Sequence, residues 1–403
     1  MLFHSTAFAV FFIIVFILYI KLPHKLQNRM LLIASYIFYG AWEWKYLALL
    51  FISTLTDYFC GLGVEKSEDS LKKRFVYLSV FINLTLLGIF KYYGFFAENF
   101  QSLMASFGVE THPYFLNIAL PVGISFYTFQ SISYTVDVYR GKLKACNNFL
   151  DFSLYVSFFP QLVAGPIERG TRLLPQILNA RKITKENIIK GLYCIFWGLF
   201  LKVVIADNMA NLVDPIYDID KSPNGILTLL ATYSFAIQIY CDFSGYSLIA
   251  IGLALLMGIE LMENFRRPYF SLNISDFWRR WHISLSSWFR DYMFSPLYIY
   301  FQNSFFLKNK SIYLRHIIFF LLTLFATEFL LGLWHGAGWN YAFFGVYHAF
   351  LIGGYYLLKK YWDKLNKYIQ IFLTFNLVCV GWLIFRSESL VQSLILIKSI
   401  FTD

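Results

Sequence analysis

Charged residues and the usual motifs of soluble enzymes are scarce in this chain of 403 residues. Only 14% of its residues are charged, whereas 58% are hydrophobic and 21% are aromatic, and the mean hydropathy is +0.55. A soluble fold cannot bury that much apolar surface, so the composition indicates a membrane protein with several spans. The sequence contains no GxGxxG motif, no phosphate-binding loop and no GxSxG motif, and therefore no signature of a nucleotide-binding enzyme or a serine hydrolase.

Cysteine and clustered metal ligands are also scarce. The five cysteines are scattered and form no Cys-x-x-Cys pair or His/Cys cluster, so we expect neither a disulfide framework nor a metal site: Cys60, Cys146, Cys194, Cys241 and Cys379. The net charge of +10 comes from 34 lysines and arginines placed between apolar runs. This pattern indicates membrane topology rather than a nucleic-acid partner.

Apolar runs recur along the whole chain, each near the ~20 residues that a helix needs to cross a bilayer. They predict an all-α polytopic protein with about eleven transmembrane helices, near residues 5–20, 30–42, 46–63, 75–90, 115–136, 188–206, 225–241, 243–259, 316–334, 340–357 and 369–385. Lys21 directly follows the first run, where a cleaved signal peptide would have small residues, so we expect a retained first span. No separate soluble domain is evident, and we expect one integral membrane domain over residues 1–403.

Basic residues concentrate in cytoplasmic loops, which gives an expected orientation. Basic loops after residue 20 and around 66–74 and 140–144 are expected inside, and the acidic loops 92–114 and 207–220 outside. The run 152–164 is too short to cross, and Pro160, Gly165 and Pro166 preclude a continuous helix there. It is expected to be a re-entrant or interfacial segment.

Residues 225–259 are long enough for two spans, which would place residues 263–315 outside. That segment carries the densest basic charge of the chain: Arg266, Arg267, Arg279, Arg280, Arg290, Lys308, Lys310 and Arg315. We follow the charge bias and place 263–315 inside. Either one of the two runs is then not a full crossing, or a half-buried helix intervenes.

His335 is the residue around which a function can be argued. It lies between two apolar runs, in the stretch Leu-Gly-Leu-Trp-His-Gly-Ala-Gly-Trp-Asn that covers residues 331–340. A titratable side chain at membrane depth is costly and indicates function by default. The glycines around it weaken a helix, and irregular backbone in a bilayer is tolerated only inside protein or along a wet cavity. The alternative is a neutral histidine bonded between packed helices.

The basic segment has helical periodicity after Ser275, the expected N-cap. Two stripes are expected on one helix, an aromatic stripe (Trp278, Trp281, Leu285, Trp288 and Tyr292) and a polar stripe (Arg279, His282, Ser286 and Arg290). Such a helix is typical of the membrane interface. Simple anchoring of the arginines, without chemistry, is the alternative interpretation.

Three islands, in this order, resemble the membrane-bound O-acyltransferase family: residues 242–247 (DFSGYS), 275–286 (SDFWRRWHISLS) and 332–337 (GLWHGA). Residues 120–127 (LPVGISFY) and 164–167 (AGPI) match as well. The resemblance covers residues 115–350 and is strongest to the bacterial alginate O-acetyltransferase branch, which includes peptidoglycan O-acetylating relatives.

The resemblance implies a ring of tilted helices around a tunnel, with His335 as the catalytic residue and His282 as the second family histidine near the cytoplasmic mouth. It implies a cytoplasmic acyl-CoA as donor substrate, with no further cofactor, and a location in the bacterial cytoplasmic (inner) membrane. For this branch it also implies an extracytoplasmic polysaccharide acceptor, reached through a partner acetyltransferase that resembles SGNH hydrolases.

Acyl transfer from a thioester to a hydroxyl needs a general base, and a neutral histidine at His335 suits this role. Arginine pairs well with phosphate, so the expected sites for the phosphates of CoA are Arg279, Arg280 and Arg290. The expected tunnel residues are Gln238, Asp242, Ser244, Trp334 and Asn340. For Asp242 a buried helix cap or a hydrogen bond in a helix gap is equally consistent, and for Gln238 and Ser244 core packing is the favoured interpretation. Glu328 is expected to line the tunnel or to be a structural acid, His348 to be structural, and Cys241 to be a less favoured covalent nucleophile.

Three functions remain open from the sequence. The first is O-acetylation of an extracytoplasmic polymer, or the related D-alanyl transfer to teichoic acid. The second is a transporter or flippase for an acyl carrier or a lipid-linked sugar. The third is a scaffold that recruits a secreted enzyme. An isolated titratable residue at depth favours the enzyme, because proton-coupled transporters usually contain chains of acidic groups.

Overall fold

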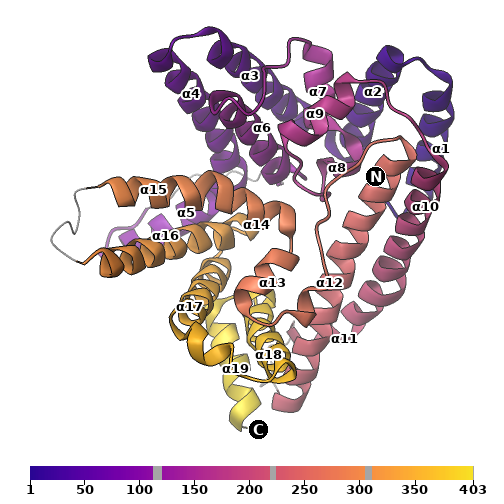
Figure 1. The fold of residues 1–403 in the computed structure, drawn as a ribbon. Helices are drawn as coiled ribbons and strands as arrows, with labels where there is room; N and C mark the ends of the chain where they lie inside the picture. The colour runs from indigo at the N-terminus through magenta and orange to yellow at the C-terminus, as the bar shows by residue number, and fades with distance from the viewer. Residues whose placement is uncertain (112–119, 218–223, 305–310, 403) are drawn as a thin grey trace. The chain divides into compact units, whose positions relative to one another are not determined.

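The computed structural model describes residues 1–111, 120–217, 224–304 and 311–402, and in these ranges the chain is helical throughout, without a strand. The start of the expected 115–136 span, Lys308 and Lys310, and part of the acidic loop 207–220 lie outside the described residues. The chain divides into two compact units: unit 1 comprises residues 1–200 and 245–262, and unit 2 comprises residues 201–244 and 263–403. Figure 1 follows the helices along the chain.

Unit 1 contains ten α-helices and a short π-helical segment that follows α4 among its described residues. They are α1 (Thr6–Lys21), α2 (His24–Glu43), α3 (Leu47–Lys66), α4 (Asp69–Leu87), η2 (Gly88–Tyr92), α5 (Tyr93–Ser106), α6 (Ile124–Tyr139), α7 (Phe149–Ser157), α8 (Phe159–Leu162), α9 (Gly170–Leu178) and α10 (Lys185–Leu199), with a 3-10 turn, η1 (Trp44–Tyr46), between α2 and α3. The C-terminal part of α12 (Gly225–Leu256) completes this unit.

Unit 2 begins in a second π-helical segment, η3 (Phe200–Ala206), and holds the N-terminal part of α12. Its other elements are α11 (Asp207–Tyr217), η4 (Pro268–Phe270), α13 (Ile274–Arg280), α14 (Ile283–Phe289), η5 (Arg290–Phe294), α15 (Ser295–Asn303), α16 (Ile312–His335), α17 (Trp339–Trp362), α18 (Lys367–Arg386) and α19 (Leu390–Thr402). Helices α16 and α17 pack against each other, and α17 also packs against α18.

Seven helical stretches within the described ranges are long and apolar enough to cross a membrane, at 24–66, 69–106, 185–217, 225–256, 312–335, 339–362 and 367–386. The all-α membrane fold is confirmed, whereas the expected count of about eleven spans is not. Much of their surface is apolar and exposed; in the stretches 69–106 and 185–217 only 17% of the most apolar window is buried. Lipid is the solvent that such a surface requires.

The two spans expected at 225–241 and 243–259 are a single helix, α12, of 32 residues. At a rise of about 1.5 Å per residue, a helix of this length is longer than one crossing of the bilayer requires and too short for two. The pair of spans was therefore wrong, and one of the two runs is not a separate crossing. The cytoplasmic location of residues 263–315 stays a prediction. Most of residues 152–164 belong to two short buried helices, α7 and α8, which are separated at Phe158. Each helix is too short to cross a bilayer.

A buried polar cluster joins α3, α4 and α6 inside unit 1. The carboxylate of Asp57 is fully buried and accepts hydrogen bonds from Ser79, from Asn83 Nδ2 at 2.6 Å and from Thr135 Oγ1 at 2.8 Å. Interhelical hydrogen bonds of this kind help to fix the register of the helices, because the hydrophobic effect contributes little to the association of helices in lipid.

Candidate active site

His335 is the last residue of α16, in unit 2. The helix ends there because Gly336 is extended, with φ −164° and ψ 153°, and only residues 336–338 separate α16 from the start of α17. The side chain of His335 is partly exposed rather than sealed. A tight, glycine-rich turn thus presents the imidazole at the end of a long apolar helix.

Gly332 and Gly345, on either side of this turn, permit close packing of α16 against α17. A Cβ atom on Gly332 would lie 2.2 Å from the carbonyl oxygen of Tyr341, and one on Gly345 would lie 2.0 Å from the carbonyl oxygen of Glu328. Both distances are far inside van der Waals contact, so only glycine permits this approach of α16 and α17. Helix α16 runs unbroken through Gly332, and the helix is interrupted at residues 336–338, where two of the glycines around His335 lie.

His282 stands at a break between two helices. Helix α13 ends at Arg280, Trp281 is extended, and His282 has φ 43° in the left-handed region before α14 begins at Ile283. The continuous helix and its two stripes were therefore wrong, and Asn273 rather than Ser275 caps α13, accepting a hydrogen bond from the Asp276 amide at 2.8 Å. The break turns His282 away from the arginines and buries it completely.

The two imidazoles meet inside unit 2. The ring centroids of His282 and His335 are 6.4 Å apart, and Trp334 contacts both, at 5.8 Å and 5.1 Å. Aromatic rings complete the surroundings: Phe243 lies 4.6 Å from His282, and Phe385 lies 5.3 Å from His335. The sequence placed 52 residues between these histidines, and only the fold brings them together.

His282 is a neutral imidazole in this setting. Burial, and then the neighbouring His335, holds the pKa of His282 well below its ordinary value. Neither Nδ1 nor Nε2 has a hydrogen-bond partner among the described residues. A buried polar group without a protein partner is rare and indicates a bound water or ligand atom. The neutral ring offers one N–H donor and one acceptor.

A pocket of about 220 Å³ opens beside α16 and contains Glu328, the acid noted in the sequence. We call it the Glu328 pocket; it is lined by Ser275, Trp278, Ser286, Phe289, Arg290, Phe294, Thr327, Glu328, Leu331 and Ile352, all of unit 2. Glu328 is 9% exposed, and its Oε2 has no hydrogen-bond partner within the described chain.

The three candidate phosphate-binding arginines are placed differently. Arg290 lines the Glu328 pocket and donates from Nε to Asp291 at 2.8 Å, which leaves its other N–H groups for a ligand. Arg280 is paired with Asp276 at 2.9 Å, and Arg279 is exposed on the surface. The geometry thus associates Arg290, but not Arg279 or Arg280, with a pocket.

The expected tunnel residue Asp242 is part of an ion-pair triad. Lys202 Nζ lies 2.7 Å from Asp242 Oδ1 and 2.9 Å from Asp207 Oδ1, in unit 2. Lys202 belongs to the π-helical segment η3, a distortion that often marks functional positions. The sequence reasoning missed Lys202, although a lysine inside the apolar run 188–206 was a signal for it.

The other expected tunnel residues are buried or partly buried. Gln238 lies one turn before Asp242 on α12, and its Oε1 is buried without a partner in the described chain. Ser244 is 4% exposed. Asn340 Nδ2 donates to the carbonyl oxygen of Ser387 at 2.7 Å, so one of its donors holds the start of α17 against the chain after α18. Whether these residues line a tunnel stays a prediction.

His348 has the structural surroundings expected of it. Trp278 Nε1 lies 3.2 Å from His348 Nδ1, and the ring is fully buried between α13 and α17. The indole N–H is a donor only, so Nδ1 accepts and the proton of the neutral ring lies on Nε2.

Comparison with known proteins agrees with the islands in the sequence. The profile of the family described as "MBOAT, membrane-bound O-acyltransferase family" matches residues 37–388. A protein of Pseudomonas putida named "Probable alginate O-acetylase AlgI" is 40% identical over 400 residues, which cover 97% of this chain and 78% of that protein.

The names of two other relatives refer to different polymers. The "Peptidoglycan O-acetyltransferase" of Helicobacter pylori is 35% identical over 399 residues, covering 91% of this chain and 72% of the relative. The "Teichoic acid D-alanyltransferase" of Bacillus subtilis is 33% identical over 290 residues, covering 68% of this chain and 70% of the relative. The matched span, the identities and the all-helical membrane fold together place this chain in the membrane-bound O-acyltransferase family, and it is an O-acyltransferase.

Proposed function

We propose that this protein transfers an acetyl group from cytoplasmic acetyl-CoA for O-acetylation of an extracytoplasmic polysaccharide, with His335 as the general base. One observation carries the proposal: a partly exposed imidazole at the end of a membrane helix faces a second, buried imidazole whose two nitrogens lack partners among the described residues. The proposed location is the bacterial cytoplasmic membrane.

The proposed step is a direct acyl transfer. The acceptor hydroxyl attacks the carbonyl carbon of the thioester while the imidazole of His335 takes the hydroxyl proton. Collapse of the tetrahedral intermediate breaks the C–S bond, and the proton passes from the imidazolium to the leaving thiolate, so that CoA departs as a thiol. The N–H group of neutral His282 is suited to donate a hydrogen bond to the oxyanion that forms on the carbonyl oxygen.

The Glu328 pocket is the proposed place for the donor. Arg290 on its rim has guanidinium N–H groups for a phosphate of CoA, and Ser275 and Ser286 add hydroxyl groups to the wall. Residues 263–315 are rich in arginine and therefore expected on the cytoplasmic side, where acyl-CoA is made. The tunnel from this pocket past His335 is part of the proposal.

The acceptor side is proposed from the relatives. The proteins named for alginate and peptidoglycan acetylation cover 97% and 91% of this chain, whereas the D-alanyltransferase covers 68% at lower identity. This difference favours O-acetylation over D-alanyl transfer, which is the second candidate. A partner acetyltransferase outside the membrane, resembling SGNH hydrolases, would accept the acetyl group or present the polymer.

Membranes containing the protein, supplied with acetyl-CoA labelled in the acetyl group, test this function. We expect label on the outer polymer or on the partner protein with wild type and with His4→Ala, a control at an exposed histidine. His335→Ala and His335→Gln should reduce labelling by about 10²–10⁴-fold, the usual contribution of a general base, while the protein still inserts. Full labelling with either variant contradicts the proposal.

The same assay separates the rival functions. A transporter would give net movement of an acyl carrier with no covalent product and would tolerate His335→Gln. A scaffold would leave acetylation unchanged in both His335 variants. Labelling from a D-alanyl thioester in place of acetyl-CoA would identify the second candidate.

A further inference from the structure

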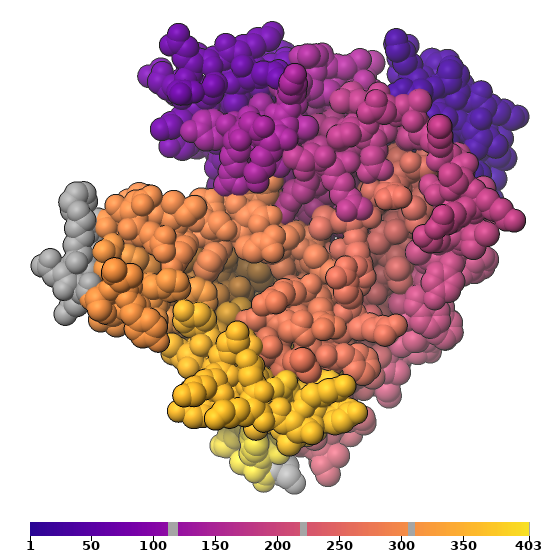
Figure 2. Space-filling model, in the orientation of Figure 1, coloured from indigo at the N-terminus to yellow at the C-terminus, as the bar shows by residue number. Residues whose placement is uncertain are grey.

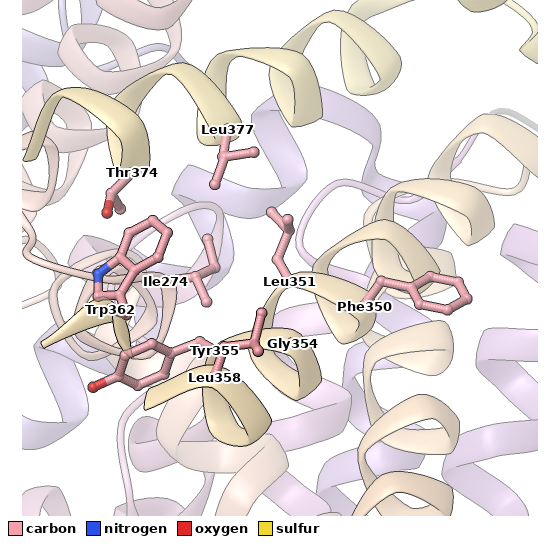
Figure 3. A pocket seen from close by; sticks show the side chains of 9 residues that line it. All are labelled: Ile274, Phe350, Leu351, Gly354, Tyr355, Leu358, Trp362, Thr374 and Leu377. Carbon is pink, nitrogen blue, oxygen red and sulfur yellow. The ribbon is translucent and has the colours of Figure 1, made fainter. Parts of the chain in front are cut away.

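A second pocket in unit 2 lies away from the two histidines, between α17 and α18. Its empty volume is about 520 Å³, and its lining is mostly apolar: Ile274, Phe350, Leu351, Gly354, Tyr355, Leu358, Trp362, Thr374 and Leu377. We call it the Trp362 pocket. Figure 3 shows that Trp362, Tyr355 and Thr374 gather at one end and Phe350 at the other, so that the pocket has a polar end and an apolar end.

Thr374 marks the polar end with an unused hydroxyl group. Its side chain is 3% exposed, and Oγ1 has no hydrogen-bond partner among the described residues. Threonine in a helix ordinarily bonds to a carbonyl three or four residues earlier, as Thr327 does to Thr323 at 2.7 Å. In Figure 3 the hydroxyl of Thr374 is turned toward Trp362. The indole N–H of Trp362 is already donated to Leu272, so it is not available to Thr374.

Positive charge surrounds the same end. The segment 359–367, which includes the turn between α17 and α18, holds four lysines and one acid: Lys359, Lys360, Lys364, Lys367 and Asp363. All four lysines are exposed, and none forms an ion pair within the ranges that the structure describes. Figure 2 shows the C-terminal part of the chain, in gold and yellow, on the surface. A lysine cluster at the end of a span is expected on the cytoplasmic side and attracts anionic lipid headgroups.

We propose that the Trp362 pocket binds an anionic phospholipid of the cytoplasmic leaflet. One acyl chain lies along Leu351, Leu377 and Phe350, an ester carbonyl accepts the hydrogen bond of Thr374, and the lysines around the turn surround the phosphate. Tryptophan and tyrosine at the polar end suit the interfacial depth of the ester groups. This lipid site is separate from acyl transfer and does not depend on the proposed function.

Gly354 offers a variant that fills the pocket. Gly354 lines the pocket, and a Cβ atom there meets no heavy atom within 4 Å, so the side chain of Gly354→Leu starts in open space. Gly94, in α5 of unit 1, is equally open and provides the matched control Gly94→Leu. Leucine also favours the helix over glycine at both positions, which makes the backbone effects comparable.

The full-length protein in detergent is titrated with phosphatidylglycerol and with phosphatidylcholine of the same acyl chains, and binding is measured by native mass spectrometry and by the shift of the melting temperature. We expect phosphatidylglycerol to bind wild type and Gly94→Leu at least tenfold more tightly than phosphatidylcholine. Gly354→Leu should lose this binding, and Lys359→Gln combined with Lys360→Gln should reduce the preference between the two lipids by at least threefold.

Thr374→Val keeps the volume and removes the hydroxyl, so it tests the site even where Gly354→Leu fails to fold. We expect severalfold weaker binding of phosphatidylglycerol. Equal affinity for the two lipids in wild type, unchanged binding by Thr374→Val, or unchanged binding by a folded Gly354→Leu each overturns the proposal. Displacement of the lipid by long-chain acyl-CoA but not by free CoA would assign the pocket to a donor acyl chain instead, and so overturn it as well.

Discussion

The imidazole of His282 lies with its centroid 6.4 Å from that of His335, and each ring comes from the end of a different helical element: His282 from the left-handed break before α14, and His335 from the C-terminus of α16. The buried ring is held neutral beside the partly exposed one. In the proposed mechanism the two histidines therefore have different roles, with proton transfer at His335 and hydrogen bonding at His282.

His282→Asn tests the second role. Asparagine tolerates the left-handed backbone better than most residues, so the break at φ 43° should survive while the ring is lost. We expect acetyl transfer to fall by about 10²–10³-fold, as when an oxyanion donor is removed. Because His282 is already neutral at physiological pH, the acid limb of the pH–rate profile should not move. Unchanged activity, or a shifted limb with normal maximal rate, would refute the assignment.

Arg290→Gln tests phosphate binding at the Glu328 pocket. We expect the KM for acetyl-CoA to rise about 10–100-fold, since a hydrogen bond to a charged group contributes about 1.5–3 kcal/mol. The KM for acetylated N-acetylcysteamine, a thioester without phosphates, should stay unchanged. Arg266→Gln is the matched control, because Arg266 is equally exposed (68% against 66%) and is also paired with a nearby acid, Glu263. An equal rise for both donors would indicate a structural role for Arg290.

The Lys202–Asp242 pair should behave as a coupled unit. Lys202→Met leaves Asp207 and Asp242 close together without their cation, and Asp242→Asn removes one of the two negative charges. Each single variant should lower the melting temperature, and the double variant should recover part of the loss. We expect a coupling free energy of about 0.5–3 kcal/mol from the thermodynamic cycle. Strict additivity of the two losses would show that the ion pair contributes nothing to stability.

Glu168 should make the stability of the protein depend on pH. Its carboxyl is fully buried, accepts a hydrogen bond from the Met262 amide, and lies 3.8 Å from Arg172. Burial raises the pKa of Glu168 to about 7 from an ordinary value of 4.5, and Arg172 only partly opposes this. The folded state therefore binds a proton that the unfolded state has released.

This contribution to the free energy of unfolding is complete below about pH 4.5 and is lost as the pH rises through about 7. Glu168→Gln keeps the shape of the side chain and cannot titrate. We expect the melting temperature of wild type to fall between pH 5 and 7 relative to that of Glu168→Gln. Parallel curves for the two proteins over this range would exclude the effect.

The sequence alone determined the class of the protein and its family, and it supplied the candidate site residues. Apolar runs and basic loops predicted an all-α membrane protein, because a helix satisfies its own backbone hydrogen bonds within the bilayer. His335 was identified because an ionisable group between two spans is costly without a function. The islands that carry His282 and Asp242 gave the family, which the comparisons then confirmed.

Only the tertiary structure decided how these residues meet. The periodicity of residues 275–292 predicted one helix, but the chain breaks at His282, whose buried ring packs against Phe243 and Trp334. Hydropathy could not distinguish one long helix from two at 225–259, and it could not predict the ion pair between Lys202 and Asp242. Local sequence records which residues are apolar or charged, whereas distances between residues far apart along the chain arise from packing, which no single segment contains.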